Sequence, residues 1–147
     1  MSLYISPEDK IFIAGARGMA GTAILKALKK AGYGENELSG KILTPTRDEL
    51  DLLNYDKVGM WFHDNNPDIV IIAAAKVGGI YANQNSPADF LLENIKIQTN
   101  VIENAWRSGV RRLLFLGSSC IYPKFANQPI REEALLTGEL EVTNEWY

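Results

Sequence analysis

Two short stretches of the chain carry residue types that could do chemistry. The first is LGSSCIYP, Leu116 to Pro123, which follows an apolar run and holds the single cysteine of the chain between serines and a tyrosine. The second is GARGMAG, Gly15 to Gly21, which also follows an apolar run and leads into an amphipathic stretch. A thiol beside hydroxyl groups suits proton transfer or nucleophilic attack, and a glycine-rich turn suits a phosphate group.

The glycine-rich turn has a GxxGxxG spacing between a predicted strand and a predicted helix. Glycines allow a tight turn there, and they let backbone N–H groups and the helix N-terminus approach a pyrophosphate. The spacing alone is a weak signal, because glycines also occur in ordinary turns between strands and helices. Its position directly after an apolar strand favours a nucleotide site over a plain turn.

Two arginines bear on which dinucleotide this site would hold. An acidic residue at the end of the second strand usually holds the ribose of NAD, whereas an arginine there meets the 2′-phosphate of NADP. Arg47 stands near that position and Arg17 lies in the glycine-rich turn, so two guanidinium groups favour NADP. The alternative is that Arg47 is a solvated surface residue and that Asp48 holds the ribose.

Cys120 begins the loop after the fourth predicted strand and has three possible uses. It could be a nucleophile, a proton-transfer group or a small buried hydrophobic residue, and the last is the default for a lone cysteine. Nucleophilic use normally needs a neighbouring histidine base. The only histidine, His63, falls near the end of the second predicted helix and is expected at the surface. Proton transfer is therefore the chemical use that the sequence favours for Cys120.

The elements around these stretches predict an α/β fold with a doubly wound parallel sheet of the Rossmann type, because short apolar runs alternate with longer amphipathic ones. DIVIIAAA is apolar on both faces, as a central parallel strand must be. The predicted strands are Lys10 to Ala14, Lys41 to Thr46 (with Pro45 near an edge), Asp68 to Ala75 and Arg112 to Gly117. The predicted helices are Ala20 to Ala31, a short one around Val58 to Phe62, Pro87 to Gly109, and a turn near Glu132 to Leu136.

The order of the strands decides which loops meet at one edge of the sheet. In the common order, the first and fourth strands are neighbours, and ligands bind outside their carboxyl ends. We therefore expect the loops that start at Gly15 and Gly117 to face one crevice.

The composition excludes several classes of protein. With 147 residues, 46% of them hydrophobic, the chain is long enough for one domain with a substantial core. The net charge of −3 and the dispersed basic residues argue against nucleic acid as a partner. Neither a signal peptide nor a membrane-spanning run is recognisable, and no metal site is predicted. We expect a cytoplasmic protein with a small-molecule or nucleotide ligand, and a single cysteine fits a reducing compartment.

The motifs also carry a resemblance. The stretches GARGMAG, TRDELDLLN, AAAKVGGIYANQNSPADF, LLFLGSSCIYPK and TNEWY resemble the amino-terminal half of the GDP-L-fucose synthase family, within the extended short-chain dehydrogenase/reductases. AAAKVGG and LGSSCIYP discriminate best, because other members of that superfamily usually lack this lysine and this cysteine. The resemblance implies NADP-dependent 3,5-epimerisation and 4-reduction of GDP-4-keto-6-deoxy-D-mannose. The alternatives are an inactive NADP(H)-binding module, or another nucleotide-sugar epimerase or reductase of this superfamily.

The resemblance further implies roles for individual residues. Ser118 would bind the C4 ketone, Cys120 would exchange the protons at C3 and C5, and Tyr147 would protonate the C4 oxygen as NADPH delivers hydride. The implied NADP site comprises Gly15, Gly18, Met19 and Gly21 at the pyrophosphate, Arg17 and Arg47 at the 2′-phosphate, Asp51 and Leu52 near adenine, and Ala73, Ala74, Ala75 and Lys76 along the cofactor.

The remaining parts of such an enzyme would follow Tyr147. They are a lysine four residues after the tyrosine, a histidine that acts as the epimerisation acid, and the lobe that binds the GDP-sugar. We therefore expect residues 1–147 to form a dinucleotide-binding domain that ends at the catalytic tyrosine, with no substrate lobe and no activity of its own. The family forms homodimers through two long helices, one of which corresponds to Pro87 to Gly109. A chain without the second half of such an enzyme should also expose apolar surface where that half would pack.

Overall fold

A computed structural model describes residues 5–35 and 40–144, so the predicted catalytic Tyr147 lies outside the described residues. The chain groups into two compact units. The first unit is Met1–Ala75 with Lys96–Leu116, and the second unit is Lys76–Ile95 with Gly117–Tyr147.

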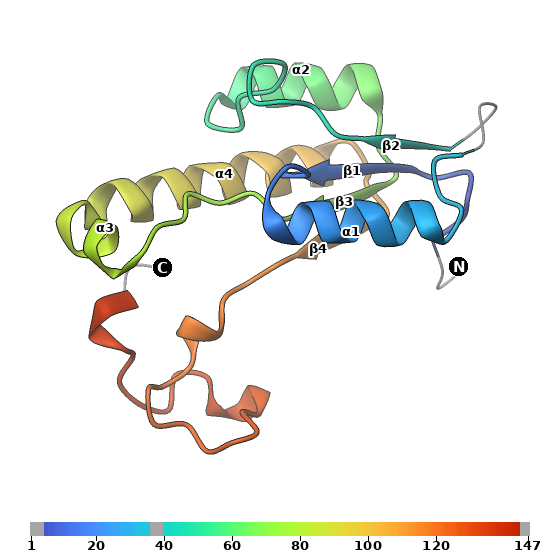
Figure 1. The fold of residues 1–147 in the computed structure, drawn as a ribbon. Coiled ribbons are helices and arrows are strands. Elements are labelled where there is room, and N and C mark those ends of the chain that lie inside the picture. Colours follow the sequence, from blue (N-terminus) through green and yellow to red (C-terminus); the bar gives the residue numbers. More distant parts are fainter. Residues whose placement is uncertain (1–4, 36–39, 145–147) are drawn as a thin grey trace. The chain divides into compact units, whose positions relative to one another are not determined.

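The first unit is built on a parallel sheet of four strands in the order β2-β1-β3-β4 (Figure 1). This arrangement confirms the predicted parallel α/β fold. Each predicted strand is present, although three of them are shorter than the apolar runs suggested. The strands are β1 (Lys10–Ala14), β2 (Lys41–Leu43), β3 (Ile69–Ile72) and β4 (Arg112–Phe115).

The predicted neighbours within the sheet were wrong. The strand after the first crossover, β2, pairs with one side of β1, and the next strand, β3, pairs with the other side. The fourth strand therefore pairs with β3 and not with β1. The chain reverses its winding direction between β1 and β3, so the switch point at which ligands bind in such sheets lies outside the carboxyl ends of these two strands. β4, the strand that precedes Gly117 in the chain, is thus separated from β1 by β3.

Residue types explain these places in the sheet. All four residues of β3 are buried, as its apolar character on both faces requires for a strand with a partner on each side. β2 is an edge strand and ends two residues before Pro45, as the proline predicted. β4 has three apolar residues after Arg112, yet Leu113, Leu114 and Phe115 are between 38% and 52% exposed.

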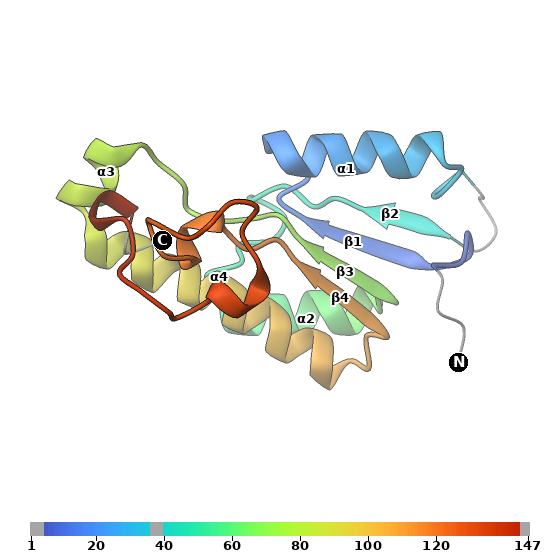
Figure 2. The ribbon, with the colours of Figure 1, turned by 90° about the horizontal axis from the view of Figure 1, so that it is seen from below.

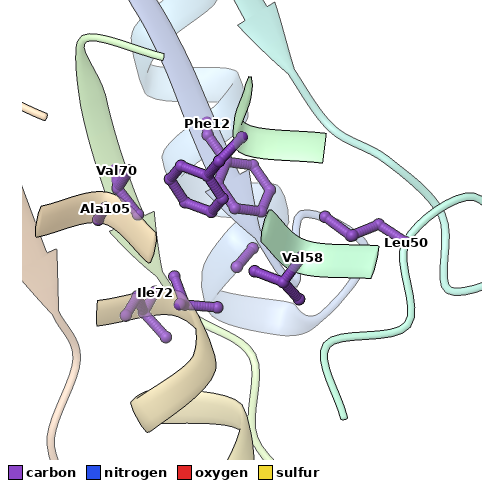
Figure 3. Close-up of a cluster of buried hydrophobic side chains, with 9 residues drawn as sticks. Phe12, Leu50, Val58, Val70, Ile72 and Ala105 are labelled. Atoms are coloured by element: carbon purple, nitrogen blue, oxygen red, sulfur yellow. The ribbon is translucent and has the colours of Figure 1, made fainter. Parts of the chain in front are cut away.

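Helices cover both faces of the sheet in the first unit (Figure 2). One face is covered by α1 (Met19–Lys30), and the other by α2 (Tyr55–Asn65) and the carboxyl-terminal part of α4 (Pro87–Arg107). Alternate residues of β1 point to opposite faces, so Ile11 and Ile13 pack towards α1 while Phe12 packs on the side of α2. Figure 3 shows the second of these clusters, where Phe12 and Val70 from the strands meet Val58 and Ala105 from the helices.

Charged groups hold the amino ends of three strands together. The buried carboxylate of Asp9 accepts hydrogen bonds from the Ser6 amide and from the guanidinium of Arg111. The carboxylate of Asp68 accepts one from the Lys10 amide at 2.9 Å, and the Arg111 amide donates to the Asp68 carbonyl at 2.9 Å. Ion pairs of Arg111 with Asp9 and Asp68 therefore link the amino ends of these strands.

The second unit contains short helical elements and the amino-terminal part of α4. Pro87 is the first residue of α4, as predicted, but the six-residue helix before it was not predicted, because glycines precede it and its apolar pattern is short. A turn of 3₁₀ helix occurs where one was predicted near Glu132. The elements are α3 (Ile80–Asn85), η1 (Ser119–Ile121), η2 (Glu132–Ala134) and η3 (Val142–Asn144).

Membrane spans are a separate question. Within residues 5–35 and 40–144, no helix combines the length and the apolar character needed to cross a bilayer.

Candidate functional site

The turn between β1 and α1 lies directly against the backbone that follows β3. Gly15 has a φ of +83°, which favours glycine, and a Cβ atom on it would come within 2.7 Å of the Ala73 carbonyl oxygen and the Ala74 nitrogen. A Cβ atom on Gly21 would overlap the Gly15 carbonyl oxygen. The Ala73 amide donates to the Ala14 carbonyl at 2.9 Å. Two of the three glycines are therefore required by close backbone contacts at the switch point.

The N-terminus of α1 suits an anion. The N-cap residue is Gly18, which has an extended backbone and supplies no side-chain hydrogen bond. The first turn of the helix has no acidic residue. The first N–H groups of a helix lack an intrahelical acceptor, and the helix dipole places partial positive charge there. Gly18 and Met19 are exposed, so a phosphate can reach these groups from solvent.

The second loop of the site carries Arg47 in a locked turn. The Thr46 amide donates to Glu49 Oε2 at 2.7 Å, and the Glu49 amide donates back to Thr46 Oγ1 at 3.2 Å. The Thr46 amide and then its hydroxyl hold the pKa of Glu49 below its usual value, and the positive charge of Arg17 lowers that pKa further. The charge of Arg17, from the glycine-rich turn, therefore acts on the turn that carries Arg47.

The stretch after this turn is anchored from α4. Leu50 is buried in the core, and the carbonyl of Leu52 accepts a hydrogen bond from Asn100 Nδ2 at 2.8 Å. The carboxylate of Asp51 accepts from the Leu53 amide at 3.1 Å. Asn100 is itself buried, so the backbone at Asp51 and Leu52 is fixed where the sequence predicted the adenine contacts.

Lys76 in the second unit is held on one face of α4. Its amide donates to Asn94 Oδ1 at 2.7 Å, and Asn94 Nδ2 donates to its carbonyl at 3.0 Å. Its ammonium group pairs with Glu93 at 2.6 Å and lies 5.6 Å from the centre of the Phe90 ring. A Cβ atom on Gly78 would meet that ring at 2.8 Å, which explains the glycine two residues after the lysine.

Ser118 and Cys120 both lie at η1, one of the short 3₁₀ helices of the second unit. Ser118 is its N-cap, and its hydroxyl oxygen accepts a hydrogen bond from the Cys120 amide at 3.1 Å. Both side chains are partly buried. The turn therefore fixes the serine hydroxyl and the thiol relative to one another.

The predicted site residues fall in both units. The first unit holds the glycine-rich turn, Arg17, Arg47, Asp51, Leu52 and Ala73 to Ala75, and the second unit holds Lys76, Ser118 and Cys120. His63 is a surface residue, as predicted, with a side chain that is 89% exposed and contacts Asp64. Among the residues that the structure describes, no three His, Cys, Asp or Glu side chains are grouped as metal ligands.

Several residues of the site were not found from the sequence. Glu49 could have been found, since Thr46 and Glu49 have the Thr-x-x-Glu spacing of a capping box. Asn100 could have been suspected, because it lies among the buried positions of α4 beside Val101. Glu93 and Asn94 have no such signal, because their partner Lys76 is 17 and 18 residues away in the chain.

A family model and individual relatives both show which family this chain belongs to. A family model described as the NAD dependent epimerase/dehydratase family matches residues 11–147. GDP-L-fucose synthase 1 of Arabidopsis thaliana is 54% identical over 138 residues, which are 94% of this chain and 41% of that protein. The GDP-L-fucose synthase of Sinorhizobium fredii is 50% identical over 147 residues, the whole of this chain and 45% of that protein.

A solved structure is similar as well. The GDP-mannoheptose C4 reductase of Campylobacter jejuni with NADP bound has a TM-score of 0.86 and 38% identity over 95% of this chain and 42% of that one. The chain thus spans less than half the length of the relatives that it matches.

The glycine contacts give a first prediction. Gly15→Ala should destabilise the fold by about 2–5 kcal/mol. Alanine is strained in the left-handed backbone conformation at this position, and its Cβ atom would overlap the backbone of Ala73 and Ala74. Gly18→Ala is the matched control. Its Cβ atom would lie 3.4 Å from the nearest atom, the Gly15 carbonyl oxygen, so the loss of folding stability should stay within about 1 kcal/mol. Urea unfolding followed by circular dichroism measures both. Equal unfolding midpoints for the two variants would contradict the close approach at Gly15.

Proposed function

Since this chain belongs to the NAD dependent epimerase/dehydratase family, we propose that it supplies the dinucleotide-binding domain of an NADP-dependent enzyme that makes GDP-L-fucose from GDP-4-keto-6-deoxy-D-mannose. The observation that carries the proposal is the 50–54% identity to enzymes named GDP-L-fucose synthase, over nearly all of this chain. The substrate lobe would belong to the part of such an enzyme that this chain does not span.

The residues at the switch point fit NADP. The open N-terminus of α1, where Gly18 and Met19 are exposed and the first turn has no acidic residue, suits a pyrophosphate. Arg17 and Arg47 would hold the 2′-phosphate, and Asp51 with Leu52 would flank adenine. Ala73 to Lys76 would line the rest of the cofactor. When bound, NADPH supplies the hydride that reduces the C4 ketone of the sugar.

The η1 turn suits the chemistry at the sugar ring. The hydroxyl oxygen of Ser118 already accepts from the Cys120 amide, so its own proton is free to be donated to the C4 ketone oxygen. That hydrogen bond stabilises the negative charge that develops on this oxygen when a proton leaves C3 or C5, both of which are α to the ketone. Cys120 would take this proton as its thiolate, and return of a proton to the opposite face inverts the carbon. Tyr147 would finally donate a proton to the C4 oxygen.

Assembly and compartment belong to the same proposal. We propose a homodimer that packs through α4, where exposed apolar residues recur along one stripe of the helix at Leu91, Ile95, Ile102 and Trp106. Light scattering that gives the monomer mass of 16.3 kDa would refute a dimer of this chain. We also propose a cytoplasmic location, in keeping with the single free cysteine.

Cofactor preference tests the first half of the proposal. Fluorescence titration of the chain should show tighter binding of NADPH than of NADH. Arg17→Ala and Arg47→Ala should each weaken NADPH binding by roughly tenfold and leave NADH binding unchanged, because only NADPH carries the 2′-phosphate. Lys29→Ala, an exposed cation in the last turn of α1, is the control. Equal affinities of the unchanged chain for the two dinucleotides would refute the phosphate site.

Deuterium exchange tests the role of the thiol. The assay uses a chimera in which these residues replace the matching ones of the Sinorhizobium fredii enzyme, with GDP-4-keto-6-deoxy-D-mannose as substrate. Cys120→Ser should reduce solvent-deuterium incorporation at C3 and C5 by at least about a hundredfold, because a hydroxyl is a far weaker base than a thiolate. NADPH binding should hardly change.

Two results would separate the alternatives. Unchanged incorporation in the Cys120→Ser chimera would show that Cys120 does not exchange these protons. Reduction of the ketone without any exchange, in the chimera with Cys120 intact, would favour a C4 reductase such as the Campylobacter jejuni neighbour.

A further inference from the structure

The turn that carries Arg47 is held by a reciprocal pair of hydrogen bonds. Thr46 and Glu49 each donate a backbone N–H to the other's side chain, at 2.7 Å and 3.2 Å. The Leu50 amide donates to the Thr46 carbonyl at 2.9 Å, and the Leu50 side chain is buried in the core. Arg47 therefore projects from a single helical turn whose two ends are tied together and anchored beneath.

The same turn brings unlike charges into one exposed place. The Thr46 amide and hydroxyl, and after them the positive charge of Arg17, lower the pKa of the Glu49 carboxyl and so favour its negatively charged form. Glu49, Arg47 and Arg17 are all exposed to solvent. Glu49 is two residues from Arg47 in the chain, and the charge of Arg17 acts on its carboxylate. These two arginines are the ones assigned to a phosphate, and a negative charge beside that phosphate would by itself repel the ligand.

We propose that Glu49 is a positioning residue for the preference between NADPH and NADH: it fixes the turn that presents Arg47, at the cost of a negative charge beside the phosphate site. The inference rests on the proposed function, because it takes Arg17 and Arg47 as the ligands of the 2′-phosphate. It assigns Glu49 two effects of opposite sign, one through its hydrogen bonds and one through its charge.

Two substitutions separate these effects. Glutamine at this position of a capping box can still accept the Thr46 N–H, so Glu49→Gln keeps the locked turn and removes the charge. Alanine removes both. The ratio of the NADH dissociation constant to the NADPH dissociation constant should therefore rise about two- to threefold in Glu49→Gln and fall about five- to tenfold in Glu49→Ala.

The experiment titrates NADPH and NADH against the full chain by fluorescence at low salt, and repeats the NADPH titrations at high salt. The gain in NADPH affinity in Glu49→Gln should shrink at high salt, because exposed charges are screened. The loss of NADPH affinity in Glu49→Ala should persist at high salt. Thr46→Val removes the hydroxyl acceptor of the same turn and should lower the ratio in the same direction as Glu49→Ala. Glu103→Gln is the control, since Glu103 also pairs with an arginine but lies on α4.

The ratio of the NADH to the NADPH dissociation constant, measured within each variant, separates a positioning role of Glu49 from a general loss of structure. A merely structural role would weaken NADPH and NADH together and leave the ratio unchanged, which would overturn the inference. Shifts of the same sign in Glu49→Gln and Glu49→Ala would overturn it as well. Failure of the unchanged chain to bind either dinucleotide would overturn the proposed function and this inference with it, whereas normal selectivity in every variant would overturn this inference alone.

Discussion

The site depends on one close approach between two backbones. The turn after β1 passes so near the chain that follows β3 that Gly15 has no room for a side chain against Ala73 and Ala74. The parallel pairing of β1 with β3 sets this approach, since Ala14 lies opposite Ile72 and the two strands end together. Gly21 closes the turn from the other side, where it packs on the Gly15 carbonyl. The start of α1 is thereby fixed at the edge of the sheet.

The other loops are positioned by anchors and not by their own strands. β2 has only three residues and ends well before Arg47, so the sheet does not fix that arginine. Thr46 and Glu49 hold the turn instead, and Asn100 of α4 holds the backbone at Leu52. Lys76 is likewise held by Asn94. Hydrogen bonds between side chains and backbone, within the turn at Thr46 and from α4 at Leu52 and Lys76, thus hold these loops where strand pairing has ended.

Local patterns were enough to predict the four strands and the longer helices, but not the short helix α3 or the neighbours of each strand. The apolar run at Ile69 to Ile72 and the stepped apolar positions of α1 identify a central strand and a covering helix, and both are present. The sequence also located the glycine-rich turn and the position of Arg47. It did not reveal that β3 lies between β1 and β4, because strand order depends on long-range pairing that leaves no periodic trace. Asn94 was not predicted for a related reason, since its hydrogen-bond partner Lys76 lies 18 residues away in the chain.

The central claim is that the carboxyl ends of β1 and β3, with the start of α1, hold the pyrophosphate of NADP. Two-dimensional NMR of the 15N-labelled chain, recorded with and without NADPH, tests it most directly. We expect the largest amide shifts at Gly15 to Met19 and at Ala73 to Ala75, with smaller ones at Arg47. Shifts that avoid the glycine-rich turn, or a spectrum that NADPH leaves unchanged, would contradict the claim.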